Sequence, residues 1–139
     1  MDFDDAPTLS GRKPPVSNGI EHIFIVEDEV LVAMDMADML EDFGFQIVGP
    51  AAHQEDAIAI ARKELIDAAF LDVNLGQKKT SEPVAEILRE RDIPFIFITA
   101  YDASQVTFRT SDERVLKKPV TGHEMLATLR ELIPEYEQN

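Results

Sequence analysis

Four short apolar runs of this sequence are each followed by polar side chains that can bind a metal ion or a phosphoryl group. These residues are Glu27-Asp28-Glu29, Asp72, Thr99 and Lys118-Pro119. Carboxylates held close together repel one another, which raises their pKa unless a cation lies among them. Magnesium suits such a set, because it binds a few carboxylate oxygens and keeps waters or phosphate oxygens as its other ligands. The residue types therefore favour a magnesium and phosphoryl site if the fold brings them together.

Each of these residues also has an ordinary structural explanation. Asp28 can cap a helix, and Asp72 can begin a turn. Thr99 can pack or cap, and Lys118 can be a solvated charge beside a turn proline. Taken singly, none of the four identifies a site. Their joint occurrence, each at the end of an apolar run, favours a shared site.

The elements that must position these side chains alternate along the chain. Strands are predicted at 22–26, 45–49, 68–71, 95–98 and 114–117. Helices are predicted at about 30–40 and at 54–65, 81–91 and 121–133, while 102–108 is only weakly helical. Because the strands are apolar throughout, the pattern predicts a parallel sheet with helices on both faces. Ligands of such sheets bind beyond the carboxyl ends of the strands.

The helical periodicity also predicts which side chains face the core. In the helix at 54–65 these are Ala57, Ile58, Ile60, Ala61 and Leu65. In the helix at 81–91 they are Val84, Ile87 and Leu88, and in the helix at 121–133 they are Met125, Leu126, Leu129 and Leu132. In the first helix, Val30, Met34, Ala37 and Leu40 are spaced for one inward face. Ser81 is expected to cap the third helix, and Pro83 fits its first turn.

Composition limits the kind of protein. The 139 residues suit one domain, and the 27 acidic and 13 basic side chains give a net charge of −14, which repels nucleic acid and anionic membranes. The absence of cysteine excludes disulfides, thiolate catalysis and cysteine-based zinc sites. The first twenty residues lack the features of a signal peptide, and no apolar run is long enough to span a bilayer. We expect a cytoplasmic protein that binds neither nucleic acid nor membrane.

The ends of the chain are expected to be flexible. Residues 1–19 contain three prolines and two glycines among polar residues, a composition that cannot bury enough apolar surface to order the chain. The predicted organisation is a flexible tail at 1–19, one domain at 20–134 and a short tail at 135–139. With no output domain expected after the last helix, output is expected to come through binding.

Four motifs in order resemble the landmarks of bacterial response-regulator receiver domains. They are IFIVEDE at 23–29, FLDVNL at 70–75, Ile98-Thr99-Ala100 and Lys117-Lys118-Pro119. The resemblance spans residues 20–134. It implies a flavodoxin-like (βα)5 fold with a five-stranded parallel sheet in the order 2-1-3-4-5. It also implies a phosphorylated signalling protein that modifies and dephosphorylates itself, rather than a metabolic enzyme.

The resemblance implies a role for each site residue. Asp72 would be the phosphoacceptor, and Mg²⁺ would be bound by Asp28, Asp72, the backbone carbonyl of Asn74, and Glu27 directly or through water. Lys118 would pair with the phosphoryl oxygens, and the Thr99 hydroxyl would move toward them after phosphorylation. Two positions, Asn74 and Tyr101, would influence the phosphoryl lifetime. Pro119 would set the backbone after Lys118 through a cis bond.

The chain departs from the common receiver pattern at one switch position. Most receivers have an aromatic residue on the fifth strand where this chain has Val115. The sequence around Thr99 instead resembles a subgroup of single-domain regulators, found chiefly in alphaproteobacteria, with a Phe-x-Thr-Gly/Ala-x-Tyr-like arrangement. In that subgroup reading Tyr101 partly replaces the missing aromatic. The segment 102–113 is short for a fourth helix, and we expect it to be mobile until phosphorylation or a partner orders it.

The expected partners are a sensor histidine kinase or a histidine phosphotransfer protein, and a downstream protein target. A monomer or a phosphorylation-dependent dimer is expected. One alternative is a receiver-like binding module that needs no phosphorylation, against which the complete set of site residues counts. Another is a magnesium-dependent phosphohydrolase, which would need an acid two residues after the nucleophile. Asn74 stands there instead.

Overall fold

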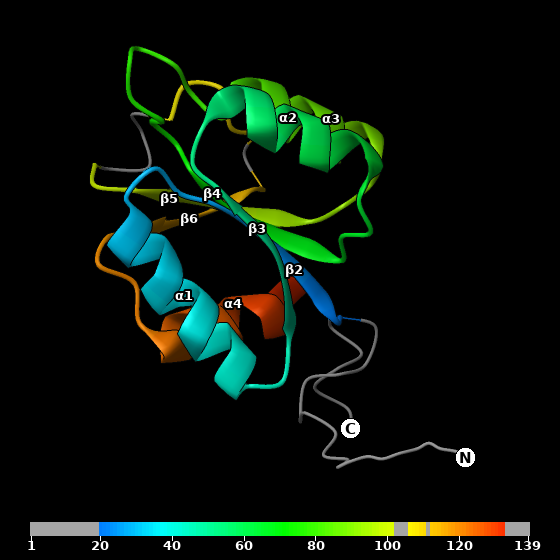
Figure 1. Ribbon diagram of the computed structural model, residues 1–139, viewed down its shortest axis with the longest axis vertical. Coiled ribbons are helices and arrows are strands. Elements are labelled where there is room, and N and C mark those ends of the chain that lie inside the picture. Colours follow the sequence, from blue (N-terminus) through cyan, green and yellow to red (C-terminus); the bar gives the residue numbers. More distant parts are fainter. Residues whose placement is uncertain (1–19, 102–105, 111, 133–139) are drawn as a thin grey trace.

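The computed structural model describes residues 20–101, 106–110 and 112–132. Within these ranges five strands and four helices follow one another along the chain (Figure 1). The strands are β2 (His22–Val26), β3 (Gln46–Ala51), β4 (Ala68–Asp72), β5 (Phe95–Thr99) and β6 (Arg114–Lys117). The helices are α1 (Val30–Asp42), α2 (Gln54–Lys63), α3 (Glu82–Glu90) and α4 (Gly122–Leu132). The predicted tails at 1–19 and 135–139 lie outside the described residues.

The five strands form one parallel sheet in the order β3-β2-β4-β5-β6. In chain order this is 2-1-3-4-5, so the fold implied by the resemblance is confirmed. The interior strands β4 and β5 are buried at every position, whereas the edge strands β3 and β6 are partly exposed. Continuous apolar sequence therefore marks the strands that are covered on both faces.

Alternate side chains of the strands serve two separate cores. Phe24, Val26 and Leu71 pack with α2 and α3 on one face of the sheet. On the other face Ile23, Ile25 and Phe70 pack with α1 and α4. Figure 1 shows the two pairs of helices on opposite sides of the sheet. Because successive strand side chains point to opposite faces, a central strand needs apolar side chains on both faces.

The predicted inward face of α1 is wrong in its first half. Ala33, Met36 and Leu40 are buried, whereas Val30 and Met34 are more than half exposed. The apolar residues of this helix lie nearly all round it, so the period alone does not decide which stripe faces the sheet. Leu65 is a second correction, because α2 ends at Lys63 and its side chain is exposed.

The other helix predictions are largely confirmed. Val84 and Leu88 of α3, and Met125 and Leu129 of α4, are buried. Ser81 stands at the N-cap of α3, and Pro83 lies in the first turn as expected. The Ser81 side chain makes no capping hydrogen bond, however, and its buried hydroxyl has no partner. Its predicted role as a side-chain cap is therefore wrong.

The connection between β5 and β6 has no helix in its described part. Residues 107–108 and 112 lie in turns. Val106 is buried, and Phe108 packs on the Phe97 ring at a centroid distance of 5.4 Å. The predicted weakly helical stretch at 102–108 falls partly outside the described residues. Within the described ranges, none of the helices is long and apolar enough to cross a membrane.

Candidate functional site

The carboxyl ends of β2, β4, β5 and β6 bring the predicted residues to one edge of the sheet. Asp72 is the last residue of β4, Thr99 the last of β5, and Lys118 directly follows β6. Glu27 directly follows β2. Because adjacent parallel strands end at the same edge, four segments far apart in sequence deliver one cluster of polar groups. Glu27, Asp72 and Thr99 are all buried.

Lys118 is the cation at the centre of this cluster. Its Nζ lies 3.2 Å from Asp72 Oδ2, 3.0 Å from Glu27 Oε1 and 3.9 Å from Glu29 Oε1. It also donates a hydrogen bond to Glu27 Oε2 at 3.3 Å. Burial would lower the pKa of Lys118, but the hydrogen bond to Glu27 and the charge of Asp72 together raise it. Lys118 is therefore held as a charged ammonium that faces the Asp72 side chain.

Asp72 is strongly perturbed. Burial is the largest cause that raises its pKa, to about 8, followed by the charge of Glu27 and a hydrogen bond with Asp28. The charge of Lys118 acts in the opposite direction. A buried carboxyl in contact with other acids is easier to keep protonated than charged. A second cation among these acids would return Asp72 to the carboxylate form.

Three acids meet the requirement for a cation site. One carboxylate oxygen from each of Glu27, Asp28 and Asp72 lies within 4.8 Å of the other two. Glu27 Oε1 is buried and accepts no hydrogen bond, since its 3.0 Å contact with Lys118 is an ion pair without hydrogen-bond geometry. The donors are all oxygens, which hard cations such as Mg²⁺ prefer. The residues present therefore fit a magnesium ion.

The loop after Asp72 closes over Asp28. An antiparallel bridge pairs Asn74 with Thr80, and the two hydrogen bonds that flank it join Leu75 to Lys79 and Ser81 to Val73. In such a pair the carbonyl of Asn74 is not used by the bridge. Gly76 has φ +79°, and a Cβ there would lie 3.6 Å from Asp28 Oδ2. The Asn74 carbonyl is therefore not used by the bridge. The positive φ two residues later favours the glycine found at position 76.

Thr99 and Pro119 border the cluster on the other side. The Thr99 hydroxyl accepts a hydrogen bond from the amide of Tyr101 at 3.0 Å, and the Thr99 carbonyl accepts one from the amide of Lys118 at 2.8 Å. The Lys118–Pro119 peptide is cis, in agreement with the expectation from the resemblance. These contacts fix the two residues that flank the acids on the β5 and β6 side.

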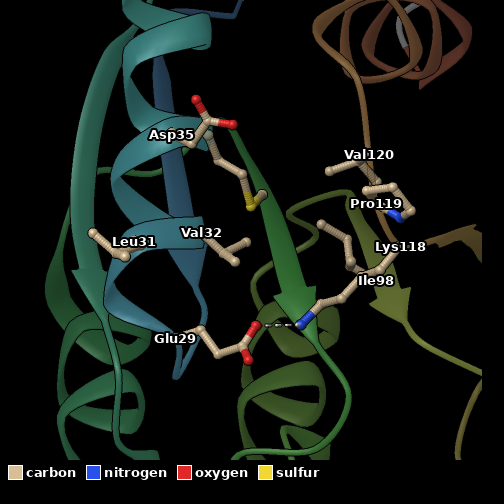
Figure 2. Close-up of a pocket in the computed structure, with 9 residues that line it drawn as sticks. Glu29, Leu31, Val32, Asp35, Ile98, Lys118, Pro119 and Val120 are labelled. Atoms are coloured by element: carbon tan, nitrogen blue, oxygen red, sulfur yellow. Dashed lines mark ion pairs between the residues drawn. The ribbon is translucent and has the colours of Figure 1, made fainter.

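A groove opens beside the cluster, between α1 and the chain after β6 (Figure 2). Its volume is about 630 Å³, and its walls come from Leu31, Val32, Ile98, Pro119 and Val120. Figure 2 shows Glu29 and Lys118 pointing toward one another at one end of this groove. The site is therefore open to a partner along an apolar wall.

The side chains of Tyr101 and Val115, which the sequence analysis singled out, do not join the cluster. Tyr101 is 57% exposed, and Val115 packs with the core on the α2 and α3 face. On this face the Phe108 ring packs against Phe97, whose register partner on β6 is Val115. Sequence reasoning assigned no role to Glu29, although its place in the acidic triplet was a usable signal.

The comparisons with known proteins agree with this geometry. The response regulator receiver domain family matches residues 23–130. The chain belongs to this family of two-component signalling proteins. Its acidic cluster is compatible with the magnesium site that receiver domains generally have.

Particular relatives are similar over parts of the chain. The solution structure of SdrG from Sphingomonas melonis is 40% identical, with a TM-score of 0.66 over 81% of this chain and 98% of SdrG. The transcriptional regulatory protein PdtaR of Mycobacterium tuberculosis is 31% identical over 65% of this chain and 44% of its own length. The phyllosphere-induced regulator PhyR of Methylorubrum extorquens is 35% identical over 57% of this chain and 30% of its own length. The chain thus spans less than half the length of the two curated relatives.

Proposed function

We propose that this chain accepts a phosphoryl group on Asp72 and signals by a phosphorylation-dependent protein contact, or passes the group on in a phosphorelay. The observation that carries the proposal is the placement of Lys118 Nζ 3.2 Å from Asp72 Oδ2, beside two further acids that fit a cation. A buried acid, a fixed ammonium and a cation site are the parts that phosphoryl transfer to a carboxylate requires.

In the proposed reaction an Asp72 carboxylate oxygen attacks the phosphorus of a phosphohistidine. The new P–O bond forms as the P–N bond breaks, and the imidazole of the donor leaves with the bonding pair. Lys118 pairs with a phosphoryl oxygen and offsets its charge. Glu27, Asp28, Asp72 and the Asn74 carbonyl would hold Mg²⁺, which when bound neutralises charge on the phosphoryl oxygens.

The Thr99 hydroxyl is the proposed reporter of phosphorylation. In the structure the hydroxyl oxygen accepts a hydrogen bond from the Tyr101 amide. A phosphoryl group on Asp72 would offer the hydroxyl a charged acceptor to which it can donate. Moving toward that acceptor releases the Tyr101 amide, which changes the start of the connection between β5 and β6. Hydrolysis of the acyl phosphate would end the signal, at a rate influenced by Asn74 and Tyr101.

The proposed donor is a sensor histidine kinase or a histidine phosphotransfer protein, and the proposed output is a downstream protein. A protein partner is supported by the membership of the receiver family, by the similarity to PhyR, and by the net charge of −14, which disfavours nucleic acid. A cytoplasmic location and a monomer or phosphorylation-dependent dimer belong to the same proposal.

Incubation with acetyl phosphate and Mg²⁺, followed by intact-mass measurement, tests the proposal. Wild type should gain one phosphoryl group, and Asp72→Asn should gain none. Asp92→Asn is the matched control, because Asp92 is exposed, remote from the site, and has a positive φ that Asn also tolerates. Borohydride reduction of the acyl phosphate should label the peptide that contains Asp72.

Two results would contradict the proposal. The first is a folded wild type that gains no mass with acetyl phosphate or with a phosphorylated kinase, which would favour a binding module that works without phosphorylation. The second is labelling of a residue other than Asp72.

A further inference from the structure

A second cluster of charged groups joins α3 to the chain just before β6. Arg89 Nε and Nη2 donate to the two carboxylate oxygens of Glu113, each at 2.8 Å. Nη2 also donates to the Phe108 carbonyl at 2.7 Å. The guanidinium lies over the Phe95 ring, 5.6 Å from its centroid. We call this Arg89–Glu113 pair, with the Phe108 carbonyl, the clamp.

The clamp closes a turn that is also bonded within itself. The Thr110 amide donates to Glu113 Oε1 at 2.9 Å, and the Glu113 amide donates to the Thr110 carbonyl at 3.1 Å. Arg109 Nη2 donates to the Glu113 carbonyl at 2.8 Å. Both the side chain and the backbone of Glu113 are therefore held. Among the described residues, Arg89 supplies the hydrogen bonds that join this turn to α3.

The pair is better protected than an ordinary surface ion pair. The side chains of Arg89 and Glu113 are 29% and 15% exposed. Burial acts to raise the pKa of Glu113, but the hydrogen bonds from Arg89 and Thr110 outweigh it and lower that pKa. Two parallel N–H···O bonds fix direction as well as distance, which a single lysine contact cannot do.

The position of the clamp relative to β6 gives it a consequence for the site. Glu113 directly precedes β6, and Lys118 directly follows it. This strand has only four residues and pairs with β5 alone, so it is an edge strand with few backbone bonds of its own. The exposed Arg114–Glu131 pair is a weak additional restraint. A shift of β6 along its length would move Lys118 by the same amount.

We propose that Arg89 is a positioning residue, which through Glu113 fixes the start of β6 and thereby holds Lys118 at the phosphoryl site. The inference rests on the proposed function for its effect on phosphoryl binding. It also predicts an effect on the position of Lys118 that does not depend on phosphorylation. The Mg²⁺ donors lie on other segments, namely the ends of β2 and β4. Loss of the clamp should therefore weaken phosphoryl binding without weakening metal binding.

The test measures Mg²⁺ affinity and beryllofluoride affinity for Arg89→Lys, Arg89→Gln and Glu113→Gln. Beryllofluoride stands in for the phosphoryl group. Arg114→Gln is the matched control, since it removes a positive charge from β6 itself but breaks only the exposed pair. We expect about tenfold weaker beryllofluoride binding in Arg89→Gln and Glu113→Gln, with a smaller loss in Arg89→Lys. Mg²⁺ affinity should not fall in any variant, because Lys118 supplies no ligand to the metal and competes with it for Glu27 and Asp72. Both affinities of the control should stay within about twofold of wild type.

Amide exchange of Lys118 supplies the readout that is independent of phosphoryl chemistry. Its amide donates to the Thr99 carbonyl at 2.8 Å, and it should exchange at least about fivefold faster when the clamp is broken. In NMR spectra, the slowly exchanging Arg89 Nε–H signal of wild type should be lost in Glu113→Gln.

The outcomes separate the two claims. Unchanged beryllofluoride affinity and unchanged Lys118 exchange in a folded Glu113→Gln variant, despite loss of the Arg89 signal, would overturn the positioning role. Failure of wild type to bind beryllofluoride would overturn the proposed function, and Lys118 exchange in the variants would then decide the clamp alone. If Arg89→Gln does not fold, the milder Arg89→Lys and Glu113→Gln variants give the same decision.

Discussion

At the scale of single residues, the acids of the site destabilise the folded protein when no metal is bound. Asp72 is buried beside Glu27, and both effects favour its protonated form. A neutral side chain of the same shape would fit this position at lower cost. Keeping an ionisable acid there is understandable if a bound cation and a phosphoryl group compensate for it, as in other sites that trade stability for function.

The stability of Asp72→Asn tests this cost. The pKa of Asp72 is raised from 3.8 to about 8, so the folded protein binds its proton more tightly than the unfolded chain does. In metal-free wild type, the free energy of unfolding should therefore fall as the pH rises from about 4 to about 8. Asp72→Asn should lack this loss and be more stable at about pH 9, by about 1 to 3 kcal/mol.

Urea unfolding in EDTA at several pH values measures the difference. The two proteins should converge toward about pH 4, where Asp72 of wild type is protonated in both states. Addition of Mg²⁺ at the higher pH should stabilise wild type more than the variant. A wild type more stable than Asp72→Asn at about pH 9 in EDTA would show that burial of this charge carries no net cost.

The site cluster is largely predictable from residue types and their order. Glu27 follows β2, Asp72 ends β4 and Lys118 follows β6, and adjacent parallel strands end at one edge of the sheet. The clamp is different, because Arg89 and Glu113 are 24 residues apart and look like ordinary surface charges in sequence. The path of the described turn residues 106–110 and 112–113 brings them together.

At the scale of elements, periodicity predicted where the helices lie better than which way they face. The amphipathic helices α3 and α4 bury most of the side chains expected of them. In α1 the apolar residues include Val30, Leu31 and Met34 on the solvent side. A helix that carries apolar residues on several stripes gives no unique inward face, and its contacts with the sheet decide the orientation.

A pair of substitutions tests the corrected face of α1. Leu40→Ala should destabilise the protein by about 2 to 5 kcal/mol, because Leu40 is fully buried and its removal leaves a cavity. Met34→Ala, from the face first predicted to be buried, should change the free energy of unfolding by no more than about 0.5 kcal/mol. Chemical denaturation with an unchanged m-value measures both. Equal losses for the two variants would contradict the assigned face.

The connection between β5 and β6 shows why one element was harder to predict. Its polar and β-branched residues favour neither helix nor strand, and the described part is held by Phe108 on the sheet and by the clamp. Such tertiary contacts leave no periodic signal in the sequence. The predicted mobility of 102–113 stays a prediction, since part of this segment lies outside the described residues.

At the scale of the whole molecule, one end of the sheet carries the chemistry and the remaining structure supports it. The sheet order follows from the family resemblance rather than from periodicity, because parallel strands of similar composition can be arranged in several orders. The strong negative charge disfavours contact with phosphate-rich surfaces. The groove beside Lys118 and the exposed side chains of α1 leave the site accessible to a protein.

Two-dimensional amide NMR of wild type and Asp72→Ala, with Mg²⁺ and beryllofluoride, tests the central claim most directly. We expect magnesium-dependent shifts in wild type around Asp72, Thr99 and Tyr101 and along β6 to Lys118, and their absence in the variant. A folded wild type with unchanged spectra, or the same shifts in Asp72→Ala, would contradict phosphoryl binding at Asp72.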